Sequence, residues 1–187
     1  MIVFDALNHS YTEDKVSLPS VTTVLKAEGF YDPRVFAEGV ANRGTEVHLI
    51  TQKIDEGLAG PKTYRLHHLY AYTLAWQKFK QDIGAEILQC EIMVGGKEAG
   101  CAGTVDRIAL IRGQQYVLDI KSGAAMSWHA IQLAGYKCLL NNLSPRRMCV
   151  YLKNTGKYTT FVHANRYDET VWKAALISYR WKKENVK

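Results

Sequence analysis

The segment at residues 103–123, GTVDRIALIRGQQYVLDIKSG, constrains the fold more than any other part of the chain. It contains two apolar runs joined by a short polar turn, which is the pattern of a β-hairpin. Asp106, Asp119 and Lys121 lie inside these runs, where burying a charge is costly unless it is paired or binds a metal. Because side chains alternate between the two faces of a strand, Asp119 and Lys121 point to the same face. The hairpin therefore predicts a concentration of charge on one face of a sheet.

The length of the hairpin turn decides which charged side chains meet. If Arg112 and Gly113 form a two-residue turn, Asp106 lies opposite Asp119 on the same face, with Cβ atoms about 4.5–5.5 Å apart. A four-residue turn would place Asp106 opposite Lys121, again on that face. A three-residue turn would put the two carboxylates on opposite faces, because one step of register turns every side chain over.

Two carboxylates at this separation repel each other unless a positive charge lies between them. A divalent cation such as Mg²⁺ suits this position, because it prefers oxygen ligands and typically binds one or two carboxylates together with substrate phosphates. Lys121 beside such a metal would suit a phosphodiester site, where it could orient the attacking water, assist its deprotonation or stabilise negative charge on phosphorus. The alternative is an exposed strand face with an ordinary Lys–Asp pair, because D-x-K alone is a common pattern.

The remaining pattern predicts helices first, followed by a mixture of strands and helices. Ser20 is expected to cap a short helix closed by Gly29, and Pro33 to open a helix that Gly57 ends. Further helices are expected at residues 63–84, at 127–140 and from about 168 onward. Strands are expected, besides the hairpin, at residues 2–11 (with a turn), 86–94, 146–152 and 158–164. This order predicts an α/β fold, with a central mixed β-sheet flanked by helices and a helical N-terminal portion.

The length of 187 residues is enough for one domain with a substantial core, and no linker or repeat divides it. We expect a single domain over residues 1–187, with a mostly helical part (1–84), a sheet core (85–165) and a C-terminal helix (166–187). The formal net charge of +6 makes an anionic partner plausible. No apolar run approaches about 18 residues, so none predicts a membrane span. The first residues do not resemble a signal peptide, so the cytoplasm is the expected compartment.

The four cysteines are widely spaced and form no C-x-x-C pair: Cys90, Cys101, Cys138 and Cys149. Three of them lie in apolar runs, where a cysteine is usually a small buried hydrophobic residue. Their spacing therefore predicts neither a zinc site nor an iron–sulfur cluster.

Four short motifs occur in order over about ninety residues: RGTEVH (43–48), GTVD (103–106), LDIK (118–121) and QLAGY (132–136). Together they resemble the PD-(D/E)xK nuclease superfamily, in its RecB-like branch that includes phage exonucleases. That branch carries a helical histidine, G-x-x-D, D-x-K and Q-x-x-x-Y in this order. The opening LPSVTTVLK (18–26) is also similar to phage members. The resemblance implies a restriction-endonuclease-like core in which residues 85–165 form the catalytic sheet.

The resemblance also implies roles for individual residues. Asp106, Asp119 and Lys121 would be catalytic, with Lys121 as the catalytic lysine. The metal ligands would be His48, Asp106, Asp119 and the backbone carbonyl of Ile120, and Glu91 would hold a second metal or position these ligands. Gln132 and Tyr136 share a helix face and would touch substrate or brace the site, together with Arg43. Some relatives hold an iron–sulfur cluster with four cysteines, but the cysteines here do not fit that layout, so none is expected.

The expected function is that of a Mg²⁺-dependent DNA nuclease, with Mn²⁺ able to substitute, acting as an exonuclease in phage-type recombination or DNA processing. The resemblance implies a phage-encoded protein in a bacterial host, with DNA, a single-strand annealing or recombination protein, and further copies of itself as candidate partners. Phosphate contacts are expected from basic residues near the end of the chain: Arg146, Arg147, Lys153, Lys157, Arg180, Lys182 and Lys183. The alternatives are an endonuclease on the same core, a catalytically inactive nucleic-acid-binding module, and a basic structural protein with ordinary surface ion pairs.

Overall fold

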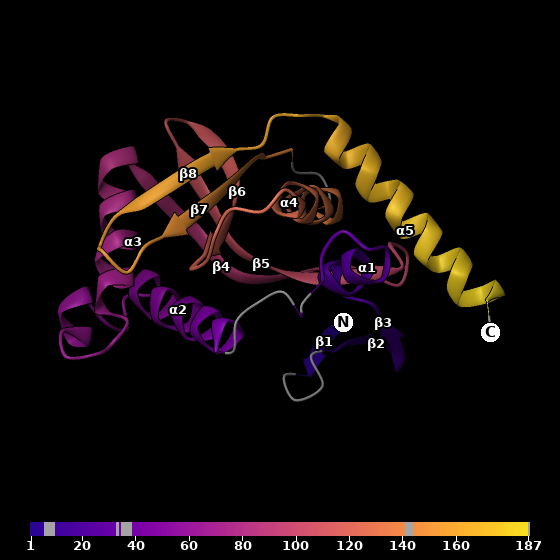
Figure 1. Cartoon of the computed structure of the whole chain (residues 1–187), viewed down its shortest axis with the longest axis horizontal. Coiled ribbons are helices and arrows are strands. Elements are labelled where there is room, and N and C mark those ends of the chain that lie inside the picture. The colour runs from indigo at the N-terminus through magenta and orange to yellow at the C-terminus, as the bar shows by residue number, and fades with distance from the viewer. Residues whose placement is uncertain (6–9, 33, 35–38, 141–143, 187) are drawn as a thin grey trace.

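Figure 1 shows the computed structural model, which describes the chain except for residues 6–9, 33, 35–38, 141–143 and 187. One sheet has the order β4-β5-β6-β7-β8, with β4 at Ala85–Gly96, β5 at Cys101–Ile111, β6 at Gln114–Lys121, β7 at Arg146–Leu152 and β8 at Tyr158–Val162. β6 and β7 run parallel, and the other neighbouring pairs run antiparallel. The expected α/β class with a central mixed sheet is confirmed.

Helices form a separate core on each side of this sheet. On one side lie α1 (Val21–Ala27), α4 (Trp128–Leu139) and α5 (Tyr167–Asn185), and on the other lie α2 (Val40–Asp55) and α3 (Tyr70–Ile83). Because parallel strands need a crossover connection, α4 links β6 to β7 and is buried along most of its length. None of the helices in the described part of the chain is long and apolar enough to cross a membrane.

A small antiparallel sheet precedes the helices and consists of β1 (Ile2–Asp5), β2 (Ser10–Glu13) and β3 (Val16–Leu18). Tyr11 and Leu18 of this sheet are buried together with Ala102 of β5. The bridge between Ser20 and Ala102 fixes the end of the small sheet beside the large one. The N-terminal portion is therefore less helical than we expected, because the strand and turn at its start continue into three paired strands.

The helix expected at residues 63–84 is wrong in its first third, residues 63–69. The chain forms a short 3₁₀ helix, η2 (Pro61–Tyr64), and α3 begins only at Tyr70. Leu66, one of the apolar residues that suggested helical spacing, is fully exposed and packs into no core. Without a buried face, helical spacing does not stabilise a helix in water.

The expected start and end of α1 are confirmed. The Ser20 hydroxyl accepts a hydrogen bond from the backbone N–H of Thr23, and Gly29 has a φ of 76° just after the helix. The helix expected to begin at Pro33 lies partly outside the described residues. Its described part, α2, begins after Gly39, which has a φ of 79°.

Asp55, at the end of α2, is the centre of a buried charge network. Its side chain is completely buried and accepts hydrogen bonds from Trp76 Nε1 (2.9 Å) and Lys80 Nζ in α3, and from Arg107 Nε (2.8 Å) in β5. Arg107 is also completely buried, and it donates through Nη2 to Thr51 Oγ1 (3.2 Å). This network ties α2 and α3 to the sheet.

The change Asp55→Asn should destabilise the protein by about 3–5 kcal/mol, because it leaves the buried guanidinium of Arg107 without its main counter-charge. Denaturant unfolding followed by circular dichroism measures this difference. Asp14→Asn is the matched control, because Asp14 pairs with Lys97 at the surface, and it should leave the unfolding midpoint nearly unchanged. Equal midpoints for the two variants would contradict the role assigned to the network.

Candidate active site

The hairpin between β5 and β6 has the two-residue turn, so the first of the three registers is the correct one. Arg112 and Gly113 have φ values of 50° and 75°, as a tight hairpin turn requires. Regular pairing ends at Arg107 opposite Leu118, one step before the two acids. There the carboxylate of Asp106 accepts the hydrogen bond that a backbone carbonyl accepts in a regular ladder, because its Oδ2 lies 2.6 Å from the N–H of Ile120.

A cavity of about 210 Å³ lies beside these acids. Seven of its lining residues are candidate site residues from the sequence analysis. They lie on five elements: His48 on α2, Glu91 on β4, Asp106 on β5, Asp119 and Lys121 on β6, and Gln132 and Tyr136 on α4. The structure therefore brings together residues separated by as many as 88 positions along the chain.

His48 reaches into the site from α2. Its Nε2 lies 2.9 Å from the carbonyl oxygen of Ile120, and its Nδ1 lies 3.4 Å from Asp106 Oδ1 and 3.9 Å from Glu91 Oε1. One ligand atom from each of His48, Glu91 and Asp106 can be chosen so that all three lie within 4.8 Å of one another. Burial lowers the pKa of His48, but the carboxylates of Asp106 and Glu91 outweigh it and raise the pKa to about 10.

Asp119 and Lys121 form an ion pair that also lines the cavity. Lys121 Nζ lies 2.8 Å from Asp119 Oδ2 and 2.8 Å from Gln132 Oε1. Burial raises the pKa of Asp119 to about 6, with nearby Asp106 adding to the effect and Lys121 opposing it. Burial opposes the charge on Lys121, but Asp119 and Asp106 outweigh it and raise its pKa.

Glu91 has the left-handed backbone conformation, with a φ of 48°. It lies in β4, two residues after Gln89, where the shift in the pairing with β5 ends. Such a conformation costs about 1–3 kcal/mol in a residue other than glycine and is common in active sites. Arg107 Nη1 holds the resulting side-chain position by donating to Glu91 Oε1 at 2.8 Å. The buried network of Asp55 and Arg107 thus extends to the candidate site.

The packing around Gly103 explains why the first residue of the G-x-x-D motif is a glycine. A Cβ atom at this position would lie 2.8 Å from Cε1 of Tyr136 and 3.3 Å from Cγ2 of Val21. The hydroxyl of Tyr136 accepts from Gln132 Nε2 at 3.2 Å, and Gln132 in turn accepts from Lys121. Glycine in β5 therefore lets α4 approach closely enough for Gln132 to reach the lysine.

Two of the basic residues expected to touch substrate lie outside this cavity. Arg43 is not among the described residues that line it, and its Nη2 instead lies 3.4 Å from the carbonyl oxygen of Ser122, just beyond β6. Arg147 is wrong as a DNA contact, because it is 3% exposed and pairs with Asp168 at 3.0 Å. It also donates to the carbonyl oxygen of Asn165 at 2.6 Å, so it joins β7 to the start of α5.

The N-terminal segment supplies lining residues that the sequence interpretation missed: Tyr11, Ser20, Val21 and Thr22. The hydroxyls of Tyr11 and Thr104 lie 2.8 Å apart and hold the small sheet against β5 at the site. The signal in the sequence was the LPSVTTVLK segment, whose resemblance to phage members gave no role to its individual residues.

The change Gly103→Ala should destabilise the protein by roughly 1–3 kcal/mol, because the new Cβ atom forces the Tyr136 ring to move in a packed core. Gly123→Ala is the matched control, since no atom lies within 4 Å of the Cβ position there. Thermal unfolding of both variants measures the effect. If Gly103→Ala proved as stable as Gly123→Ala, the explanation given for this glycine would be incorrect.

No protein-family model matches the sequence, and no curated protein matches it. Among solved structures, a chain described as "Crystal structure of SSO0001" is similar, with 17% identity and a TM-score of 0.44. The similarity covers 89% of this chain and 71% of that chain. These comparisons assign no family, so the chemistry of the site has to be inferred from its own residues.

Proposed function

We propose that this protein is a divalent-metal-dependent DNA nuclease that hydrolyses phosphodiester bonds. The observation that carries the proposal is the grouping of His48, Glu91 and Asp106 within 4.8 Å, on a cavity that Lys121 also lines. Acidic oxygens, an imidazole and a partly buried ammonium in one concave site are typical of sites that handle phosphate esters.

The donor atoms of the site fit Mg²⁺ or Mn²⁺. Asp106 and Glu91 offer carboxylate oxygens, Ile120 offers a backbone carbonyl, and His48 offers one nitrogen. Hard divalent cations prefer such oxygen-rich sets. Asp119 lies on the same cavity, so it would join the ligands once a cation draws it away from Lys121.

A bound metal would supply an activated water and neutralise charge on the phosphate. Lys121 has three N–H donors, and in this structure Asp119 and Gln132 accept from it. A remaining N–H can bind a phosphate oxygen in the cavity and stabilise its growing negative charge. Gln132 and Tyr136 would keep the amine in that position.

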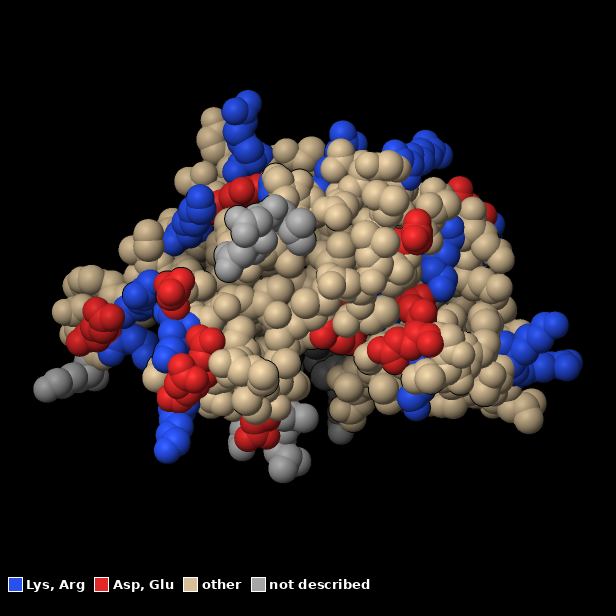
Figure 2. Space-filling view, turned by 180° about the vertical axis from the view of Figure 1, so that it is seen from behind, with Lys and Arg blue, Asp and Glu red and all other residues tan. Residues whose placement is uncertain are grey.

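The affinity for DNA would come mainly from phosphate contacts made by exposed basic residues. Figure 2 shows one face on which Lys and Arg lie mostly around the margin, among scattered acids, with a hollow at the lower edge. Of the basic residues expected to contact DNA, Arg146, Lys153, Lys157, Arg180, Lys182 and Lys183 are exposed, although Lys182 pairs with Glu28. Exonuclease action, a role in phage-type recombination and a cytoplasmic location in a bacterial host rest on the motif resemblance alone.

Calorimetry with Mn²⁺ tests the metal site directly. The protein should bind Mn²⁺, and Asp106→Asn should weaken this binding by more than about 100-fold. Replacing a residue that only supports a metal ligand typically lowers metal affinity by about 10–100-fold, and Asp106 is proposed as a direct ligand. The asparagine can still accept from the N–H of Ile120, so the fold should persist. Asp14→Asn removes an exposed carboxylate and should bind Mn²⁺ like the unaltered protein. Unchanged affinity in Asp106→Asn would refute the ligand assignment.

Cleavage of end-labelled single- and double-stranded DNA, with and without Mg²⁺, tests the activity. Asp119→Ala and Lys121→Ala should each lower the rate by roughly 10²–10⁴-fold or more, because each removes a group that acts on the reacting phosphate. Lys97→Ala is the matched control, since Lys97 is an exposed lysine that also pairs with an aspartate. Full cleavage by either site variant would end the catalytic assignment.

The same assay separates the alternatives. Degradation of linear DNA with no cutting of covalently closed circles would support an exonuclease, and cutting of the circles would support an endonuclease. Binding of DNA without any Mg²⁺-dependent cleavage would identify the chain as an inactive binding module.

A further inference from the structure

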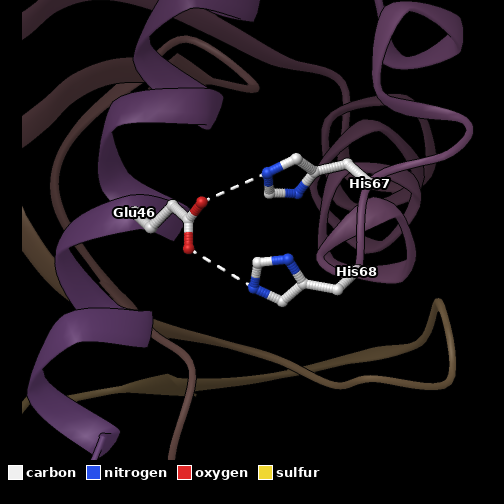
Figure 3. Close-up of side chains that lie close together, drawn as sticks. All are labelled: Glu46, His67 and His68. Carbon is white, nitrogen blue, oxygen red and sulfur yellow. Dashed lines mark ion pairs between the residues drawn. The ribbon is translucent and has the colours of Figure 1, made fainter.

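A second group of metal-binding side chains lies outside the candidate active site. Figure 3 shows the imidazoles of His67 and His68 pointing at the carboxylate of Glu46. His67 Nε2 lies 3.1 Å from Glu46 Oε1, and His68 Nε2 lies 3.4 Å from Glu46 Oε2. The two rings stack with centroids 4.5 Å apart, and one ligand atom of each residue lies within 4.8 Å of the others.

These separations match the coordination shell of a small transition-metal ion. Zinc binds imidazole nitrogen at about 2.0–2.1 Å and carboxylate oxygen at about 2.0–2.2 Å, so tetrahedral ligand atoms lie about 3.3 Å apart. The two nitrogen–oxygen distances of the cluster are close to this value, and they run to the two different oxygens of Glu46, so small side-chain shifts would bring both imidazoles to one ion. Two imidazoles and one carboxylate also form a known zinc ligand set that leaves a fourth position for water.

The cluster is distinct from the candidate active site in both position and chemistry. Glu46 precedes His48 by two positions in α2, and side chains two apart on a helix do not face each other. Two imidazoles favour Zn²⁺, Ni²⁺ or Cu²⁺, whereas Mg²⁺ favours oxygen ligands. The two sites should therefore differ in the metal that they bind.

We infer that Glu46, His67 and His68 form a surface site for a borderline transition-metal dication, represented by Zn²⁺. The ion would join the segment between η2 and α3 to α2. Among the contacts described for these three residues, the Glu46 carboxylate is what links these two parts of the chain without the ion. His68 is 69% exposed and Glu46 39%, so the ion has direct access from solvent.

Metal binding through Nε2 would require the other neutral tautomer of the His67 ring. The backbone N–H of Leu69 donates to His67 Nδ1 at 3.2 Å, so the ring proton is on Nε2, from which it is donated to Glu46. Coordination through Nε2 moves the ring proton to Nδ1 and gives up the contact with Leu69. The free energy of Zn²⁺ binding must therefore exceed the loss of this single long hydrogen bond.

Zinc titration in a background without the first site tests the inference. The full-length variant Asp106→Asn/Asp119→Asn should still bind one Zn²⁺ by calorimetry in excess Mg²⁺. Adding His68→Gln should weaken this binding by more than about 100-fold, because it removes a direct ligand. Adding Glu56→Gln instead, at an exposed acid beyond the same helix, should leave it unchanged. Zn²⁺ binding that is absent from the background variant, or insensitive to His68→Gln, would overturn the inference.

A second measurement does not depend on how well the background variant folds. Cu²⁺ bound to the otherwise unaltered protein should show electron paramagnetic resonance couplings from two imidazole nitrogens, and His68→Gln should remove one of them. Zn²⁺ should also raise the melting temperature of the unaltered protein more than that of His68→Gln. If His68→Gln changed neither the spectrum nor the Zn²⁺-dependent shift, the site would be refuted.

Discussion

The hydrogen bonds of the buried Arg107 guanidinium are the interactions on which most of the structure depends. It is completely buried, yet it donates to Asp55 at the end of α2, to Thr51 one turn earlier, to Glu91 in β4 and to the backbone carbonyl of Asp106. A planar group with five donors can hold four acceptors at once, which a lysine could not do. The same side chain therefore fixes the packing of α2 on the sheet and the position of a carboxylate in the cavity.

Charge balance accounts for the arrangement of the cavity. Three carboxylates, Glu91, Asp106 and Asp119, line it. Among the described residues, His48, Lys121 and Arg107 bring positive charge to them, with Arg107 Nη1 at 2.8 Å from Glu91 Oε1. Each carboxylate already has a positive or N–H partner, so the acids tolerate burial. Under the proposed function, a divalent cation among them would replace the contacts of 3.4 and 3.9 Å with direct ligation.

The sequence predicted the hairpin and its charged face because both depend on local rules. Alternation placed Asp119 and Lys121 on one face, and the Arg112–Gly113 turn set the register. The strained backbone of Glu91 and the ion pair of Asp55 with Arg107 depend instead on tertiary packing, for which the sequence carries no local signal. The helix expected across residues 63–84 begins only at Tyr70 for the same reason, since the apolar spacing did not reveal that Leu66 would find no core.

The crossover formed by α4 has a consequence for how the molecule is made. His48 and Ile120, whose atoms meet in the cavity, are 72 residues apart, and Gln132 joins them only after the chain has passed through β6 and turned back as α4. Contacts between residues so far apart in sequence form slowly, because the chain loses the entropy of closing a long loop before these contacts stabilise it. A chain emerging from the ribosome therefore carries the acids and the lysine before α4 has been synthesised, and it cannot complete the lining of the cavity until that helix is present.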